Sequence, residues 1–133
     1  MDLFAAARLA ELLSEEPEIA APANPVALPE PAQGAIDFDH VTFRYPTRPE
    51  VSALNDFTLS VAPGETVALV GPSGGGKSTI LSLLPRFYDV TGGAVRLNGV
   101  DIRDLRLPDL RDHIALVTQA PFLFDDTLAP NIA

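Results

Sequence analysis

The stretch LVGPSGGGKSTI, residues 69–80, combines residue types that bind an anion. A glycine-rich backbone, a lysine and hydroxyl side chains lie here between two apolar segments. Gly71 is followed by four residues and then by Gly76, Lys77 and Ser78, the spacing of the phosphate-binding loop called Walker A. Glycines allow the backbone to curl so that successive N–H groups point at phosphate oxygens. The stretch therefore predicts a site for the phosphates of a nucleotide.

Two side chains of this loop have specific expected roles. Lys77 should bridge the β- and γ-phosphates as a mobile point charge, and the Ser78 hydroxyl is the expected Mg²⁺ ligand. The N-terminus of the following helix should add partial positive charge. The predicted nucleotide-contacting residues of the loop are Gly71, Ser73, Gly74, Gly75, Gly76, Lys77, Ser78 and Thr79.

A loop of this kind requires a strand before it and a helix after it. The continuous apolar run over 66–70 predicts a buried strand, and apolar residues at helical spacing over 80–87 predict the helix. Pro85 should kink or end that helix early. A second buried strand is predicted over 114–118. Because buried apolar strands are typical of parallel sheets, this half of the chain predicts an α/β fold.

The residues before the loop have a different pattern. Apolar residues alternate with polar ones over 36–45, and a one-residue slip at His40–Val41 predicts a strand with a β-bulge. Alternation over 57–61 predicts a second strand. After the loop, Asn98–Gly99 predicts a tight hairpin, and a proline in the first turn suits a short helix over 108–112.

The N-terminal part differs in composition from the rest. Residues 2–14 are rich in alanine and leucine and predict a short helix. Five prolines between Pro17 and Pro31 predict an extended linker, with a frayed N-terminal arm as the open alternative. The predicted division is a connector helix over 1–16, a proline-rich linker over 17–34 and an ordered domain over 35–133.

Composition narrows the classes of function. The 133 residues carry a formal net charge of −9, which argues against nucleic acid as a partner, because such proteins cluster Lys and Arg. An anion site must then be built locally. The absence of cysteine excludes disulfides and thiolate chemistry. No apolar run approaches the roughly 18–20 residues that span a bilayer, so a water-soluble chain is expected, with the cytoplasm as the default compartment.

The sequence resembles the nucleotide-binding domain of ATP-binding cassette (ABC) transporters, in particular exporters whose ATPase is fused after the membrane domain. Three segments carry the resemblance: VTFRYPTRPEVSALNDFTLSVAPGETVALVGPSGGGKST, LLPRFYDVTGGAVRLNGVDIRDL and HIALVTQAPFLFDDTLAPNIA. The N-terminal AAARLAELLSEEPEI is similar to the connector between the membrane domain and the ATPase. The implied fold is an α/β P-loop NTPase (RecA-like core) with an antiparallel β subdomain, truncated before the Walker B strand.

The resemblance also implies ligands, partners and further site residues. The implied cofactors are ATP and Mg²⁺, with Tyr45 stacking on adenine and Gln119 contacting Mg²⁺ or the attacking water. Lys77 and Gln119 are the implied catalytic residues. The apolar region Pro121–Phe124 would lie beside the groove that receives the transmembrane domain. A second nucleotide-binding domain would complete a dimer at the cytoplasmic face of the membrane.

One departure from the family pattern concerns catalysis. Nothing in the 133 residues matches the signature motif, the Walker B aspartate with its catalytic glutamate, or the switch histidine. We therefore expect this chain to bind ATP without efficient hydrolysis and its intact parent to be an exporter ATPase. A truncated, non-catalytic nucleotide-binding module remains an alternative. A small P-loop nucleotide kinase is a weaker one, because strands and Tyr45 precede the strand that leads into the loop.

Overall fold

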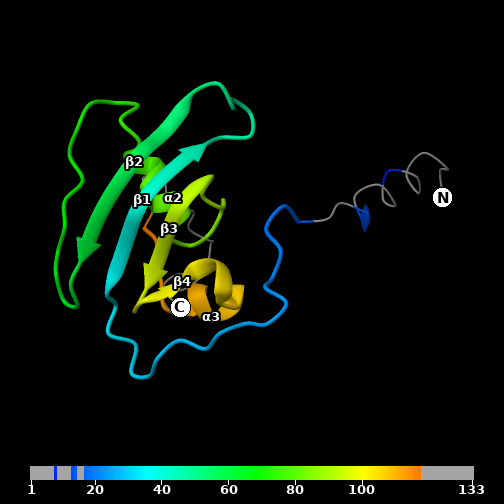
Figure 1. Cartoon of the computed structure of the whole chain (residues 1–133), viewed down its shortest axis with the longest axis vertical. Coiled ribbons are helices and arrows are strands. Elements are labelled where there is room, and N and C mark those ends of the chain that lie inside the picture. The colour runs from blue at the N-terminus through cyan, green and yellow to red at the C-terminus, as the bar shows by residue number, and fades with distance from the viewer. Residues whose placement is uncertain (1–7, 9–12, 15–16, 118–133) are drawn as a thin grey trace, which may run out of the picture.

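The computed structural model describes residues 8, 13–14 and 17–117 (Figure 1). Four strands form one antiparallel sheet in the order β2–β1–β3–β4, and short helices follow the second and fourth strands (Figure 1). The predicted α/β composition with an antiparallel sheet is thereby confirmed. The elements are β1 (Ile36–Arg44), β2 (Ser52–Val61), α2 (Lys77–Leu83), β3 (Gly92–Leu97), β4 (Val100–Asp101), the 3₁₀ helix η1 (Ile102–Asp104) and α3 (Leu107–Asp112).

The pairing of β1 with β2 explains the break in the alternating pattern. Phe38 pairs with Leu59, whereas Val41 pairs with Phe57, so the register shifts between them. His40 lies within this irregularity with φ of 48°, and the predicted bulge is confirmed. β2 begins at Ser52, five residues earlier than predicted, because pairing with β1 extends it through a stretch that lacks clean alternation.

The predictions made from turn and helix signals also agree with the structure. Asn98 and Gly99 both have positive φ, 50° and 81°, and they join β3 to β4 as a tight hairpin. α2 ends at Leu83, before Pro85, and α3 forms over the predicted residues. The sheet, α2, η1 and α3 jointly build the hydrophobic core. Its buried members are Phe38, Val41, Phe43, Leu54, Ile80, Leu83, Val95, Leu97, Ile102, Leu105 and Leu110.

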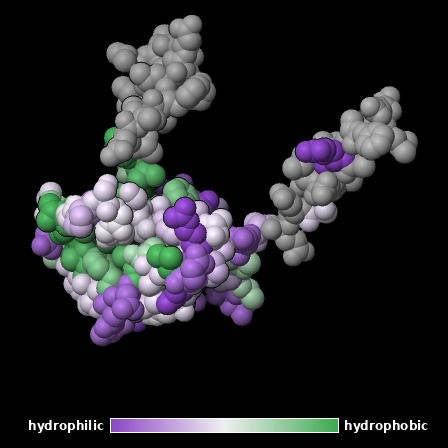
Figure 2. All heavy atoms as spheres, turned by 90° about the horizontal axis from the view of Figure 1, so that it is seen from above, coloured by the Kyte–Doolittle hydropathy of each residue, from purple (hydrophilic) through white to green (hydrophobic). Residues whose placement is uncertain are grey.

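Two predicted strands are wrong. Residues 66–70 and 114–117 form no strand in the structure, and residue 118 lies outside the described residues. Val70 is 89% exposed and Val117 is 91% exposed, so neither run is buried. A buried strand needs a hydrogen-bonded neighbour, and the described residues supply none for these runs. Apolar surface appears between polar areas of the globular part in Figure 2.

The proline-rich segment precedes β1 in the chain and runs alongside the globular part before it enters that strand (Figure 1). Val26 forms a parallel bridge with Leu105, and its N–H donates to the Asp104 carbonyl at 2.8 Å. Most of the predicted helix over 2–14 lies outside the described residues. Within the residues that are described, no helix has both the length and the apolar character to cross a bilayer.

Candidate nucleotide-binding site

A cleft of about 500 Å³ lies where the glycine-rich loop meets the first residues of β2. This volume is within the range of small-molecule sites. The loop supplies one side of the cleft, and the segment between β1 and β2 supplies the other. The lining residues are Tyr45, Arg48, Val51, Ser52, Ala53, Ser73, Gly74, Gly75, Gly76, Lys77, Ser78 and Thr79.

The loop approaches β2 closely at Gly76. This residue precedes α2 and has φ of 81°, a conformation that glycine adopts without steric cost. A Cβ atom at this position would lie 2.8 Å from the Ala53 carbonyl oxygen and 2.8 Å from Leu54 Cδ2. Earlier in the loop, the Gly75 N–H donates to the Pro72 carbonyl at 3.1 Å. Glycine at 76 therefore allows the loop to pack directly against the sheet.

The ammonium group of Lys77 is held against the loop. Its Nζ donates to the carbonyl oxygens of Gly71 at 2.7 Å and Pro72 at 2.6 Å. Gly71 does not line the cleft itself, but its carbonyl orients the lysine that does. The loop backbone thus positions the principal cation of the predicted phosphate site.

Tyr45 connects the two sides of the cleft. Its hydroxyl lies 2.8 Å from the hydroxyl of Thr79, which is 34 residues away in sequence and belongs to α2. Its ring packs edge-on against Phe43, with 4.9 Å between ring centroids. The structure therefore brings the predicted base-stacking residue next to the predicted phosphate-binding residues.

The lining of the cleft is cationic although the chain is acidic. Arg48 and Lys77 are lining residues, whereas no Asp, Glu or His among the described residues lines it. Arg48 is not among the residues predicted from the sequence, although its position three residues after Tyr45 could have indicated that it lines the same site. The N–H of Arg48 donates to the Tyr45 carbonyl at 2.9 Å, so a tight turn brings the two residues together.

Two predicted parts of the site belong to the C-terminal segment 118–133. Gln119 and the Pro121–Phe124 region lie outside the described residues. Within the part of the chain that the structure describes, no group of three or more His, Cys, Asp or Glu side chains is arranged to hold a metal ion.

The loop, the helix after it and β2 from Leu54 onward fall within a region that matches a known protein family. The family model described as "ABC transporter" matches residues 54–131. This chain belongs to the ABC transporter family. The predicted resemblance is thereby confirmed, and nucleotide binding is the property that this ABC domain implies.

The relatives of this ABC chain include exporters. It is 49% identical over 131 residues to mouse ATP-binding cassette sub-family B member 10, mitochondrial, covering 98% of this chain and 18% of that protein. It is 56% identical over 104 residues to the ATP-dependent lipid A-core flippase of Yersinia pestis, covering 78% and 18%. A solved structure of a bacterial Atm1-family ABC exporter with ATP bound matches with a TM-score of 0.85 at 38% identity, covering 98% and 22%. The chain thus spans about a fifth of the length of these relatives.

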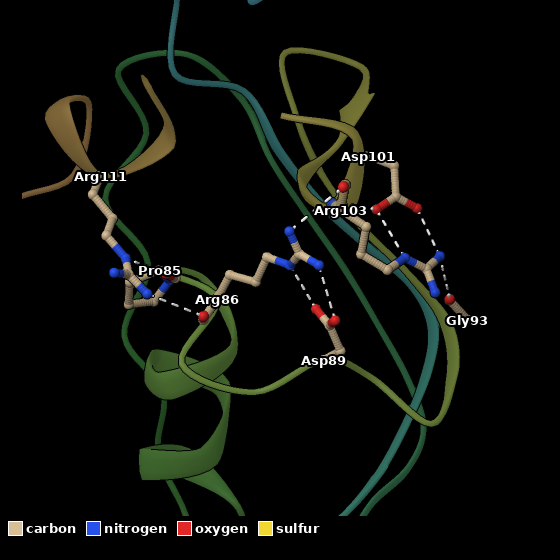
Figure 3. Close-up of polar contacts among 7 residues, drawn as sticks. All are labelled: Pro85, Arg86, Asp89, Gly93, Asp101, Arg103 and Arg111. Carbon is tan, nitrogen blue, oxygen red and sulfur yellow. Dashed lines mark hydrogen bonds and ion pairs between the residues drawn. The ribbon is translucent and has the colours of Figure 1, made fainter. Parts of the chain in front are cut away.

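In this ABC chain, arginine contacts fix the segment that follows α2 (Figure 3). Arg86 pairs with Asp89, and Arg111 of α3 donates to the Pro85 carbonyl at 3.1 Å. Arg103 binds Asp101 through Nη2 at 2.7 Å. Burial raises the pKa of Asp101, but hydrogen bonds from Arg103 outweigh it and leave that pKa below its ordinary value. Arg111 thus holds the segment after α2 against α3, and Arg86 Nη1 links the same segment to η1 by donating to the Arg103 carbonyl at 3.5 Å.

Proposed function

We propose that the cleft binds Mg-ATP, with the phosphates at the glycine-rich loop and the base at Tyr45. The observation that carries this proposal is the composition of the cleft. It combines the Walker A residues, an aromatic ring and two cations, and none of the described residues that line it carries a carboxylate. In a chain of net charge −9, such a local cationic site is specific for an anion.

The lining residues fit this ligand. Lys77 would contact the β- and γ-phosphates, and backbone N–H groups over 73–79 would hold their oxygens. Mg²⁺ is usually held by nucleotide phosphates, waters and few protein oxygens, so the Ser78 hydroxyl suffices without an acidic cluster. Gln119 would add a second contact to the metal or to water. When bound, Mg²⁺ neutralises phosphate charge.

We further propose that the intact protein is an exporter ATPase, in which ATP hydrolysis drives transport. This proposal is supported by the ABC exporters among the relatives. Residues 1–16 would then be a connector helix, 17–34 a linker and 35–133 part of the ATP-binding domain. The transmembrane domain would contact the region around Pro121–Phe124, a second nucleotide-binding domain would complete the dimer, and the site would lie at the cytoplasmic face of the membrane.

The ATP-binding proposal is tested by titrating the 133-residue chain with a fluorescent ATP analogue. Lys77→Ala should weaken binding by several kcal/mol, because it removes charge-assisted contacts to phosphate. Tyr45→Ala should cost about 1–3 kcal/mol, whereas Tyr45→Phe keeps the ring and should cost little. Equal affinity of wild type and Lys77→Ala would refute the phosphate assignment. Unchanged affinity in Tyr45→Ala would refute base stacking.

A second candidate function for this polypeptide is nucleotide binding without turnover. The specific observation is that no Asp, Glu or His lines the cleft, so the described residues place no general base there. General-base catalysis typically contributes 10²–10⁴-fold. We expect phosphate release from Mg-ATP by the 133-residue chain to equal that of Lys77→Ala. A Lys77-dependent rate on the order of 1 s⁻¹ would contradict this expectation.

A further inference from the structure

We propose that Tyr88 is a positioning residue that holds the ring of Tyr45 for the base of the nucleotide. This inference rests on the proposed function of the cleft. The centroids of the two rings lie 5.3 Å apart with an interplanar angle of 86°, an edge-to-face contact. Such contacts are favourable and directional, so they restrict the orientation of a neighbouring ring.

Tyr88 acts on Tyr45 from outside the cleft. Tyr45 lines the cleft, whereas Tyr88 is half-buried and does not line it. Phe43 contacts both rings, at 4.9 Å from Tyr45 and 5.5 Å from Tyr88, so the three rings form a mutually contacting cluster. We call these residues the aromatic cluster. Its only member at the cleft is Tyr45, and the other two support it.

The hydroxyl end of Tyr45 is fixed separately. It hydrogen-bonds at 2.8 Å to the hydroxyl of Thr79, a residue of α2 that is only 5% exposed. The ring is therefore held by two aromatic neighbours and the hydroxyl by a buried partner. A ring ordered before binding loses less conformational entropy when it stacks on a base, and this preorganisation increases affinity.

The segment that carries Tyr88 is itself anchored. Arg86, two residues earlier, pairs with Asp89, the next residue after Tyr88 (Figure 3). Arg111 of α3 donates to the carbonyl oxygens of Pro85 at 3.1 Å and Arg86 at 3.3 Å (Figure 3). These contacts fix the backbone on both sides of Tyr88. Tyr88 thus links the anchored segment after α2 to the ring of Tyr45, which is the ring proposed to contact the base.

The test compares two probes on the 133-residue chain, Mg-ATP and Mg-tripolyphosphate, by calorimetric titration. Tripolyphosphate has the phosphates of ATP without the base. Tyr88→Leu keeps apolar bulk but removes the ring, and it should raise the dissociation constant for ATP about threefold to tenfold. The same variant should bind tripolyphosphate as the wild type does. Tyr88→Phe keeps the ring and should therefore bind ATP with the affinity of the wild type.

Phe87→Leu is the matched control. Phe87 is the neighbouring aromatic residue, is 47% exposed and contacts Arg111, but it is not in the aromatic cluster. The Phe87→Leu variant should bind both ATP and tripolyphosphate with the affinity of the wild type. If Tyr88→Leu weakens both probes equally, the effect is on the fold and the positioning role is wrong. If it weakens neither, the role is also wrong.

Intrinsic tyrosine emission supplies an independent readout. The chain has two tyrosines and no tryptophan, so in Tyr88→Phe all tyrosine emission comes from Tyr45. ATP should change that emission, whereas tripolyphosphate should not. At the same ATP concentration, the change in emission should be smaller in Tyr88→Leu than in Tyr88→Phe. Identical amplitudes at equal ATP would overturn the inference. A wild type that binds neither probe would refute the proposed function, and the positioning role with it, whereas normal wild-type binding with an unaffected Tyr88→Leu refutes only the positioning role.

Discussion

The guanidinium of Arg86 holds the carboxylate of Asp89 through two parallel hydrogen bonds, from Nε to Oδ1 at 2.7 Å and from Nη2 to Oδ2 at 3.0 Å. Arg86 is 5% exposed, so its side of the pair is shielded from water. Its backbone has φ of 55°, a region that glycine adopts more readily than other residues. The contacts of the side chain therefore outweigh the conformational cost of arginine just after α2.

Substitutions at Arg86 should separate these two effects. Arg86→Ala removes the pair and keeps the strained backbone, so it should lower the free energy of unfolding by about 2 kcal/mol or more. Arg86→Gly also removes the pair but relieves the strain, and it should be about 1 kcal/mol more stable than Arg86→Ala. Urea unfolding measures both. Equal stability of the two variants would show that the backbone at this position is not strained.

Two glycines of the loop should respond differently to alanine. Gly74 and Gly76 have φ of 80° and 81°, so alanine costs about 1 kcal/mol of backbone strain at either position. Nothing lies within 4 Å of a Cβ at Gly74, whereas at Gly76 the Cβ would meet Ala53 and Leu54 at 2.8 Å. Gly76→Ala should therefore destabilise the chain by roughly 1–3 kcal/mol more than Gly74→Ala, because it also overpacks the contact with β2. Equal melting temperatures of the two variants would contradict the close approach.

Asn98 should tie the linker to the hairpin. Its Oδ1 accepts from the N–H groups of Gly34 at 2.9 Å and Ala35 at 3.1 Å. Asn98→Ala removes both bonds and should cost about 1–2 kcal/mol. Asn98→Asp keeps an acceptor and serves as the control, with a smaller cost. Hydrogen exchange at Gly34 and Ala35 should accelerate in Asn98→Ala alone, and unchanged protection there would exclude this role of Asn98.

The ion pair at the bulge should make stability depend on pH. His40 Nδ1 lies 2.6 Å from Asp56 Oδ1, and this hydrogen bond, followed by the charge of Asp56, raises the His40 pKa above its ordinary value of 6.5. The charged form is thus favoured by folding, so the stabilisation is fully present below about pH 6.5 and is lost as pH rises through the folded-state pKa. The unfolding midpoint in urea should fall over that interval in the wild type. Asp56→Asn should not show this fall, and a fall of equal size there would assign it to other groups.

Short-range signals account for the features that could be predicted. The bulge at His40–Val41 follows from a slipped alternation, and the hairpin at Asn98–Gly99 follows from two residues that tolerate positive φ. The start of α2 follows from the spacing of the glycine-rich loop. Each depends on neighbours within a few residues, which a sequence pattern records directly.

The two failed strand predictions have the opposite cause. An apolar run over 66–70 is compatible with a buried strand, but a strand exists only when another segment pairs with it. Such pairing depends on residues far away in sequence, and the described residues pair with neither this run nor 114–117. Periodicity alone therefore overestimated the parallel part of the sheet.

The sequence by itself determined the glycine-rich loop and the helix that follows it, because their spacing signal lies in adjacent residues. Phosphate binding by Gly71, Gly76, Lys77 and Ser78 stays a prediction from that spacing. Only the tertiary structure decided what faces it. The Tyr45 hydroxyl reaches Thr79 across 34 residues, and the turn after β1 brings Arg48 to the same cleft. These contacts depend on how β1 and β2 pack against α2, and side-chain packing between distant segments leaves no periodic signal in the sequence.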